Sequence, residues 1–303
     1  MTLLVAAVDA GSFSAAGRKL GVPLPTVSRK IAELEAQLNT RLLVRSTRRL
    51  TLTEAGAAYL ASAKQILELV ADAERAAGGE YETPRGELVV TAPVAFGRLQ
   101  VLPVIDDFLA SFPDIRVRLV LSDRNLHLID EHIDVAVRVG RLRDTTMVAS
   151  QVGLLPRVVC ASPAYLAVRG TPLTPADLAG HDCITLEGLL AGAPWAFAAK
   201  TGGLVPAPSI HPRLTVNTAE AAVDAAVAGT GVTQVLAYQA WAAVGAGRLK
   251  VLLRGFEPAP SPVSLIHAGQ GLLPVKTRRF LDVAAPRLRA AIQAGLDALD
   301  AAA

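Results

Sequence analysis

The residues of this chain whose types and spacing suggest chemistry are cations near its N-terminus. Residues 1–60 carry eight lysines and arginines against four acids, which leaves a net charge of +4, whereas the whole chain of 303 residues has a formal charge of +3. A basic segment on a nearly neutral body is suited to neutralising phosphates. A solvated charged face would give the same count, so the placement of the cations must decide between the two.

Two short helices are expected to position these cations. Ser12 or Ser14 caps a first helix that runs to about Leu20, and Gly21 permits the turn after it. Pro25 then falls in the first turn of a second helix, where proline is tolerated. The side chains expected to face inward from the first helix are Ala15, Ala16 and Leu20.

The second helix is the element that would present cations to a partner. Its apolar residues fall at i, i+4, i+7 and i+11, which predicts one buried face: Val27, Ile31, Leu34 and Leu38. The opposite face then carries Thr26, Arg29, Lys30 and Glu33. In a DNA major groove Arg29 can reach guanine edges, and Thr26 and Ser28 can reach bases or phosphates. Ser28 flanks a buried residue, however, and could instead bond its own helix.

A hairpin with a cationic tip is predicted next, because two short apolar runs at 42–44 and 50–52 flank three arginines. Such a hairpin would lie along phosphates and would position the protein without specifying a sequence. Helix, turn, helix and hairpin together indicate a winged helix-turn-helix. The expected DNA contacts are Pro25, Thr26, Ser28, Arg29, Lys30, Arg45, Arg48 and Arg49.

A long helix is expected to follow, capped by Thr53 and ending at Gly78. A stripe at spacings of three and four residues runs along it: Leu60, Ala63, Leu67, Val70, Glu74 and Ala77. This stripe predicts a dimer seam. Packing against its own domain is the alternative, since alanine suits either.

The segment 78–86, GGEYETPRG, is polar and rich in helix breakers, which predicts a linker. Beyond it, β-branched runs alternate with helical segments at 99–112 and 125–132, which predicts a parallel sheet with crossover helices. The expected strands cover 88–91, 117–121, 135–139, 158–160, 184–186, 214–216, 232–236 and 263–267. The later strands predict a second α/β lobe and a return to the first.

Several function classes are disfavoured. Cys160 and Cys183 lack the basic neighbours that a redox switch needs, and the five histidines form no metal-binding pattern, so no metal or cofactor is expected. The chain contains no nucleophile elbow, phosphate loop or dinucleotide motif, which argues against an enzyme. No export signal is recognised, and the uncharged stretch 225–247 predicts a helix, a strand and a helix rather than a membrane span. We therefore expect a cytoplasmic protein.

These motifs resemble those of one bacterial family, the LysR-type transcriptional regulators. The N-terminal resemblance runs from about Leu4 to Leu60 through AGSFSAAGRKLGV, TVSRKIAELEAQL and TRLLVRSTRRLTLTEAG. A looser resemblance continues through TAPVAFGR, HIDVAVRVG and GLLPVKTRRFLD. The chain departs from the family pattern in having few residues before its first helix, in Gly17 where alanine is usual, and in Leu24 where a polar residue commonly precedes the proline.

The resemblance implies a domain organisation and a set of partners. A DNA-binding domain would cover 1–60, a linker helix 53–79, a hinge 80–86 and an effector domain 87–303. The effector domain would resemble a periplasmic binding protein, with lobe one at about 87–161 and 267–303 and lobe two at about 162–266. A small molecule would bind between the lobes, and the protein would bind promoter DNA as a homodimer or homotetramer, with RNA polymerase as a further candidate partner.

The expected effector site begins where a strand leads into a helix in TAPVAFGR, because free amides there could bind a carboxylate. The candidate residues are Thr91, Pro93, Val94, Ala95, Phe96, Asp123, Arg138, Gly140 and Asn217. For the last four, a structural turn explains the residue nearly as well as a ligand contact. A small organic acid is the expected effector.

The sequence thus predicts a sequence-specific DNA-binding regulator of the LysR type, modulated by a small molecule. The alternative is a ligand-independent architectural DNA-binding protein, which would show little sequence selectivity. A solute-binding protein or an enzyme would keep its activity after deletion of residues 1–80.

Overall fold

The computed structural model describes residues 1–45, 50–77, 83–124, 126, 128, 131–142, 147–187, 195–198, 204–205, 210–268 and 273–301. The chain forms two compact units. The first comprises Met1–Pro84 with Gly271–Arg278, and the second comprises Arg85–Gln270 with Arg279–Ala303.

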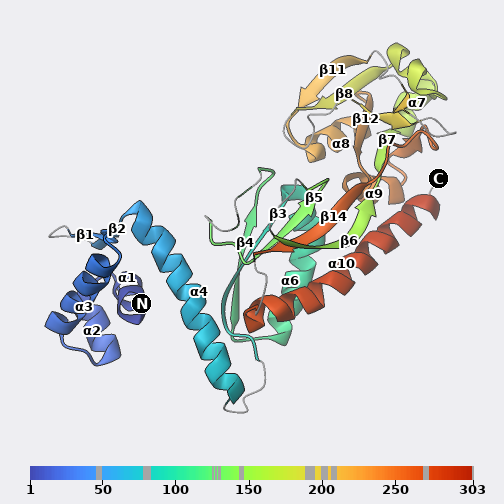
Figure 1. Ribbon diagram of the computed structural model, residues 1–303. Helices are drawn as coiled ribbons and strands as arrows, with labels where there is room; N and C mark the ends of the chain where they lie inside the picture. Colours follow the sequence, from blue (N-terminus) through green and yellow to red (C-terminus); the bar gives the residue numbers. More distant parts are fainter. Residues whose placement is uncertain are drawn as a thin grey trace. The chain divides into compact units, whose positions relative to one another are not determined.

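Three helices open the first unit (Figure 1): α1 (Thr2–Asp9), α2 (Phe13–Leu20) and α3 (Leu24–Gln37). Ser12 caps α2, because its hydroxyl accepts a hydrogen bond from the Ala15 amide at 3.1 Å. Gly21 ends α2 in the left-handed conformation at φ +67°, which glycine adopts without strain. Both the cap and the turn agree with the prediction.

The core of this unit joins the three helices to the hairpin and to the helix that follows. Ala16, Val27 and Ile31 are fully buried as predicted. Leu20 and Leu38, which were expected to face inward, are instead 37% and 40% exposed. Leu38 comes after the last residue of α3, so the helical periodicity that predicted its burial no longer applies there.

Gly17 allows close packing between α2 and the turn that follows it, which its low helix propensity does not explain. A Cβ atom at this position would lie 2.6 Å from the carbonyl oxygen of Val22, whose amide in turn donates to the Gly17 carbonyl at 2.9 Å. The turn therefore folds back closely on α2. Glycine weakens the helix by about 1 kcal/mol relative to alanine, but it permits this approach.

The predicted hairpin and long helix are both present. Strands β1 (Leu43–Arg45) and β2 (Leu50–Leu52) pair in antiparallel fashion, and α4 covers Glu54–Ala77. The Thr53 hydroxyl accepts from the Gly56 amide at 2.9 Å and so caps α4. The hairpin tip with Arg48 and Arg49 lies outside the described residues, as does most of the expected linker.

Two five-stranded sheets build the second unit. The first has the order β4-β3-β5-β14-β6, formed by β3 (Gly86–Ala92), β4 (Ile115–Leu121), β5 (Val135–Val139), β6 (Val148–Leu155) and β14 (Ser261–His267). The second has the order β11-β8-β12-β7-β13, formed by β7 (Arg157–Ala161), β8 (Asp182–Leu186), β11 (His211–Val216), β12 (Val232–Leu236) and β13 (Lys250–Leu252). A short pair, β9 (Phe197–Ala198) and β10 (Leu204–Val205), is separate from both.

The sheets are mixed, so the prediction of a parallel sheet is confirmed for only part of each: β3 pairs in parallel with β4 and β5, and β8 pairs in parallel with β11 and β12. Strand β14 runs antiparallel to β5 and β6, and β7 runs antiparallel to β12 and β13. The sequence predicted neither β6 nor β13. Much of β6 is exposed, and it therefore lacks the continuous apolar run of a buried strand.

Helices cover these sheets. They are α5 (Val94–Phe96), which continues through a π-helical turn at Gly97–Val101 into α6 (Leu102–Ser111), then α7 (Pro163–Arg169), a 3₁₀ helix at Pro175–Gly180, α8 (Ala219–Val227), α9 (Ala237–Gly245) and α10 (Val275–Ala301). The stretch 225–247 forms helix, strand and helix as predicted. Of the helix expected at 125–132, residues 126, 128, 131 and 132 form turns and irregular structure, and the other four lie outside the described residues.

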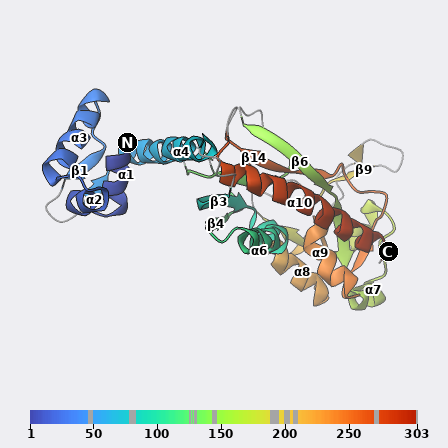
Figure 2. The same cartoon turned by 90° about the horizontal axis from the view of Figure 1, so that it is seen from below.

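The crossings between the sheets correct the expected lobe boundaries. Strand β7, assigned to lobe one, belongs to the second sheet, and β14, assigned largely to lobe two, belongs to the first. One crossing therefore lies at Pro156, between β6 and β7. Figure 2 shows α10 lying along β6 and β14. Ile292 of α10 packs in the hydrophobic core of the first sheet, and Leu299 of α10 packs in a hydrophobic cluster of the second sheet.

Candidate DNA-binding surface and effector site

Arg29 lies on the side of α3 opposite the buried Val27 and Ile31, as the helical spacing predicts. Its side chain is 65% exposed, and Pro25, in the first turn of the same helix, is exposed as well. Thr26 and Ser28 are half-buried on either side of Val27. On the side opposite its buried residues, the N-terminal half of α3 therefore presents Arg29 beside short side chains, a composition that suits a DNA groove.

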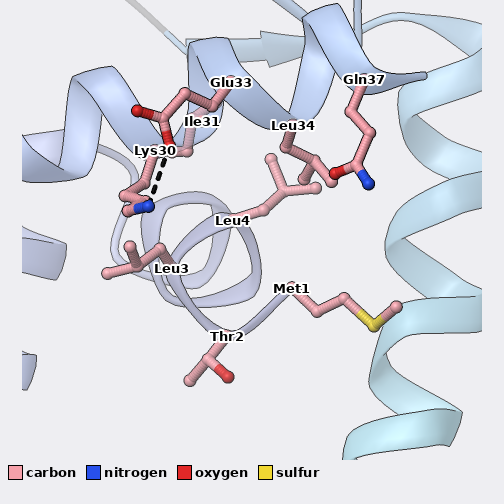
Figure 3. Close-up of a pocket in the computed structure, with 9 residues that line it drawn as sticks. All are labelled: Met1, Thr2, Leu3, Leu4, Lys30, Ile31, Glu33, Leu34 and Gln37. Atoms are coloured by element: carbon pink, nitrogen blue, oxygen red, sulfur yellow. Dashed lines mark ion pairs between the residues drawn. The ribbon is translucent and has the colours of Figure 1, made fainter.

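Lys30 occupies a different side of α3 from Arg29. Together with Leu34 and Gln37 it lines a hollow of about 370 Å³ that is closed on the other side by Met1–Leu4. Figure 3 shows Lys30 lying toward Leu3, with its ammonium group paired to Glu33. The sequence analysis placed Lys30 and Arg29 on the same outward face of α3. The structure corrects this, because Lys30 lies on the flank of α3 toward α1.

Two glutamates of α3 have roles that the sequence analysis did not assign. The Glu33 carboxylate pairs with both Arg29 Nη1 at 3.3 Å and Lys30 Nζ at 2.9 Å. The Glu35 carboxylate accepts hydrogen bonds from the amides of Leu42 and Leu43, at 2.8 and 3.0 Å. Glu35 thereby fixes the start of the hairpin on α3. Its position next to Leu34, at the edge of the buried face, is the signal that could have revealed this role.

The expected effector residues lie where β3 and β4 end. Pro93 precedes the first turn of α5, and the Val94 amide, which was expected to bind an effector carboxylate, donates to Asp123 Oδ1 at 3.0 Å. The buried Thr91 hydroxyl donates to the carbonyl of Val120 at 2.8 Å. Thr91 therefore joins β3 to β4, and Asp123 already occupies the predicted carboxylate position.

Ala95 and Phe96 are buried. The Phe96 ring contacts the ring of Tyr238 in α9 edge-on, with centroids 5.2 Å apart. These two rings connect a helix that follows the first sheet to a helix that follows the second. Phe96 thus has a packing role between the two sheets.

The other expected effector residues are dispersed. Arg138, in β5, donates from Nη2 to the Leu126 carbonyl at 3.1 Å, and burial lowers the pKa of its guanidinium. The Gly140 amide donates to the Pro262 carbonyl at 2.8 Å, and its φ of +112° favours glycine. Asn217 is exposed after β11. For Arg138 and Gly140 the observed bonds support the alternative of a structural turn.

Arg98, the last residue of TAPVAFGR, lies near Asp123 together with two residues that the sequence analysis did not name, Glu220 and Tyr238. Arg98 of the π-helical turn and Glu220 of α8 form an ion pair, with nitrogen and oxygen 3.9 Å apart. Tyr238 is almost fully buried, and its burial, reinforced by the charges of Asp123 and Glu220, raises the pKa of its phenol. The sequence could not reveal this group, because its members come from α5–α6, α8 and α9 and lie far apart along the chain.

The cysteines lie apart in the second sheet. Cys160 in β7 and Cys183 in β8 are separated by β12, and they pack in different hydrophobic clusters. Burial raises the pKa of Cys160 to about 12 and that of Cys183 to about 11. Neither thiol is therefore appreciably ionised at neutral pH.

Comparison with known proteins decides what this combination of units is. Residues 1–57 match the family model of the bacterial regulatory helix-turn-helix protein, lysR family, and residues 82–289 match that of the LysR substrate binding domain. The chain belongs to the LysR family. An HTH-type transcriptional regulator of Xanthomonas campestris pv. campestris (strain 8004) is 34% identical over 288 residues, which cover 94% of this chain and 84% of the relative.

Solved structures agree. The structure of CrgA, a LysR-type transcriptional regulator from Neisseria meningitidis, shares 31% identity with a TM-score of 0.62, covering 95% of this chain and 97% of CrgA. The full-length Vibrio cholerae virulence activator AphB shares 27% identity with a TM-score of 0.60, covering 93% of this chain and 96% of AphB.

These findings confirm the predicted fold class, a winged helix-turn-helix joined to a two-lobed α/β effector domain. This LysR-type protein is a DNA-binding transcriptional regulator, and its relatives are named as regulators rather than enzymes. Within the described part of the chain, no helix is both long and apolar enough to cross a membrane.

Proposed function

We propose that this LysR-type regulator recognises promoter DNA with the N-terminal half of α3 and the β1–β2 hairpin. The observation that carries this proposal is the placement of Arg29, which projects from the side of α3 opposite its buried residues and is 65% exposed. A guanidinium in that position can donate two hydrogen bonds to one guanine, one to O6 and one to N7. Thr26, Ser28, Pro25 and the hairpin arginines would contact neighbouring bases or phosphates.

The proposed oligomer is a homodimer or homotetramer that uses α4. In this helix Ala63 is buried and Leu60 packs against the N-terminal core, so these two residues of the expected stripe serve their own domain. Ile66 and Val70, one turn apart, are 44% and 48% exposed. We place the dimer seam on this second pair, because exposed apolar residues at i and i+4 gain most from a partner helix.

The proposed effector binds between the two sheets, near Val94, Asp123 and Tyr238. A small organic acid remains the proposed class, and it would have to displace the Asp123 carboxylate from the Val94 amide. Such a ligand alters regulation only if it binds one arrangement of the lobes better than another. Transmission through α4 to the spacing of DNA half-sites, with RNA polymerase as a further partner in the cytoplasm, completes the proposal.

The test is a gel-shift titration of the purified protein on the DNA upstream of its own gene and on a scrambled duplex, at physiological salt. Specific recognition would be supported if half of the upstream DNA is retarded at a protein concentration about 1000-fold lower than the concentration that retards half of the scrambled duplex. Equal retardation of both would instead indicate the alternative, an architectural DNA-binding protein. No retardation of either would contradict the proposed interface.

A further inference from the structure

Arg29, which is proposed to contact DNA, and the neighbouring Lys30 share one acid. Arg29 Nη1 and Lys30 Nζ lie 3.3 and 2.9 Å from the two oxygens of Glu33. All three side chains are about half exposed, at 65%, 52% and 46% respectively. Hydrogen bonding from Lys30 lowers the pKa of Glu33, so its carboxylate is ionised throughout the neutral range. The free protein therefore presents a +2 pair whose charge is partly neutralised by its own side chain.

We propose that Glu33 is a positioning residue that sets the sequence selectivity of α3, by orienting Arg29 for a base edge and by competing with DNA phosphates for Arg29 and Lys30. This inference rests on the proposed contact of α3 with DNA. It goes beyond that contact because it assigns the discrimination between specific and non-specific DNA to an acidic residue.

The orienting effect follows from the geometry of the guanidinium. Arginine has five N–H donors in a fixed plane. With Nη1 bonded to Glu33, the donors on Nε and Nη2 remain to bond an acceptor pair such as guanine O6 and N7. An arginine held by an acid loses less side-chain freedom on binding than one that moves freely. Specific binding therefore benefits from Glu33.

The competing effect acts on phosphates. Non-specific affinity comes from cations that release counterions at the DNA backbone. A carboxylate beside two such cations repels the same phosphates and reduces the net charge that α3 can offer. A well-placed base edge bonds Nε and Nη2 of Arg29 and leaves the contact with Glu33 in place, whereas a randomly placed phosphate must compete with Glu33 for the same cations. Non-specific binding is thereby held down.

The experiment compares the full-length protein with Glu33→Gln, which removes the charge and keeps the size of the side chain. Asp224→Asn, in the exposed part of α8, is the matched control because it changes the net charge equally. Affinities are titrated on a scrambled duplex and on a duplex that the wild-type protein selects from a random library, between 50 and 200 mM salt. Circular dichroism spectra establish that each variant is folded.

We expect Glu33→Gln to bind the scrambled duplex more tightly than wild type and to lower the ratio of specific to non-specific affinity. The slope of log affinity against log salt concentration on the scrambled duplex should steepen by about 0.9. The ratio of the variant's affinity to that of wild type should therefore grow about 3-fold to 4-fold as the salt falls from 200 to about 50 mM. Asp224→Asn should match wild type. Unchanged affinity and slope on the scrambled duplex, or an unchanged ratio, would overturn the proposal.

A second variant separates this proposal from the proposed function. In a chain carrying Arg29→Ala and Lys30→Ala, the effect of Glu33→Gln should largely disappear, because the cations through which it acts are gone. An undiminished effect would show that Glu33 acts by general charge, which contradicts a positioning role. If the wild-type protein selects no sequence, the proposed function fails instead, and the scrambled duplex alone still tests the competition for phosphates.

Discussion

Replacing Gly56 by alanine sets helix propensity against packing in the first turn of α4. Propensity alone favours alanine by about 1 kcal/mol in a helix interior. A Cβ atom at Gly56, however, would lie 1.9 Å from the carbonyl oxygen and 2.8 Å from the carbonyl carbon of Leu42. Both atoms are backbone, so no side-chain rotation relieves the contact and the two segments must separate.

That separation has a calculable cost. The Leu42 carbonyl accepts the Thr53 amide at 3.0 Å, and the Thr53 hydroxyl donates to the Arg41 carbonyl at 2.7 Å. Overpacking typically costs about 1–3 kcal/mol, and weakening one such hydrogen bond costs about 1 kcal/mol. After about 1 kcal/mol of propensity is subtracted, Gly56→Ala should destabilise the DNA-binding unit by about 1–3 kcal/mol. The hairpin should also lose its attachment at Arg41 and Leu42.

Differential scanning calorimetry of the full chain would measure this effect. For a unit of this size, 1 kcal/mol corresponds to about 4–8 °C in midpoint, so the transition of the DNA-binding unit should fall by at least about 4 °C. Gly245→Ala is the matched control, because this glycine ends α9 and a Cβ atom there would have no other atom within 4 Å; this variant should not be destabilised. A midpoint for Gly56→Ala at or above that of wild type would refute the packing argument.

Three further predictions concern the effector domain. Phe96→Ala should cost about 3–5 kcal/mol in unfolding free energy, measured by denaturant titration, because the ring is fully buried between the sheets. Burial lowers the pKa of His181, whose Nδ1 lies 3.2 Å from the Tyr165 hydroxyl. The unfolded chain then binds this proton more readily, so stability should fall as the pH drops below about 6.5; a pH series on His181→Gln should show a smaller fall. Cys160 and Cys183 should resist a thiol reagent until the protein is unfolded, and rapid labelling of the native protein would contradict their burial.

The candidate sites were predictable to different degrees. The side of α3 that carries Arg29 followed from the spacing of Val27 and Ile31, because a helix of known period has a fixed set of outward positions. The effector residues were less accessible to this reasoning. A strand end can hold a ligand contact or a structural turn, and only the hydrogen bonds of Arg138 and Gly140 distinguish the two.

The sequence by itself determined where several helices of this protein begin and end. Ser12 and Thr53 cap their helices because a hydroxyl at that position satisfies an amide a few residues away, and such contacts need no distant partner. Tertiary structure alone decided which strands share a sheet. Strands β7 and β14 are apolar runs like the other strands. Which sheet each of them joins depends on where the chain crosses from one sheet to the other, and the types of the residues do not encode that position. The same holds for Asp123 on the Val94 amide, since the two residues are 29 positions apart and meet only because β3 and β4 pair side by side.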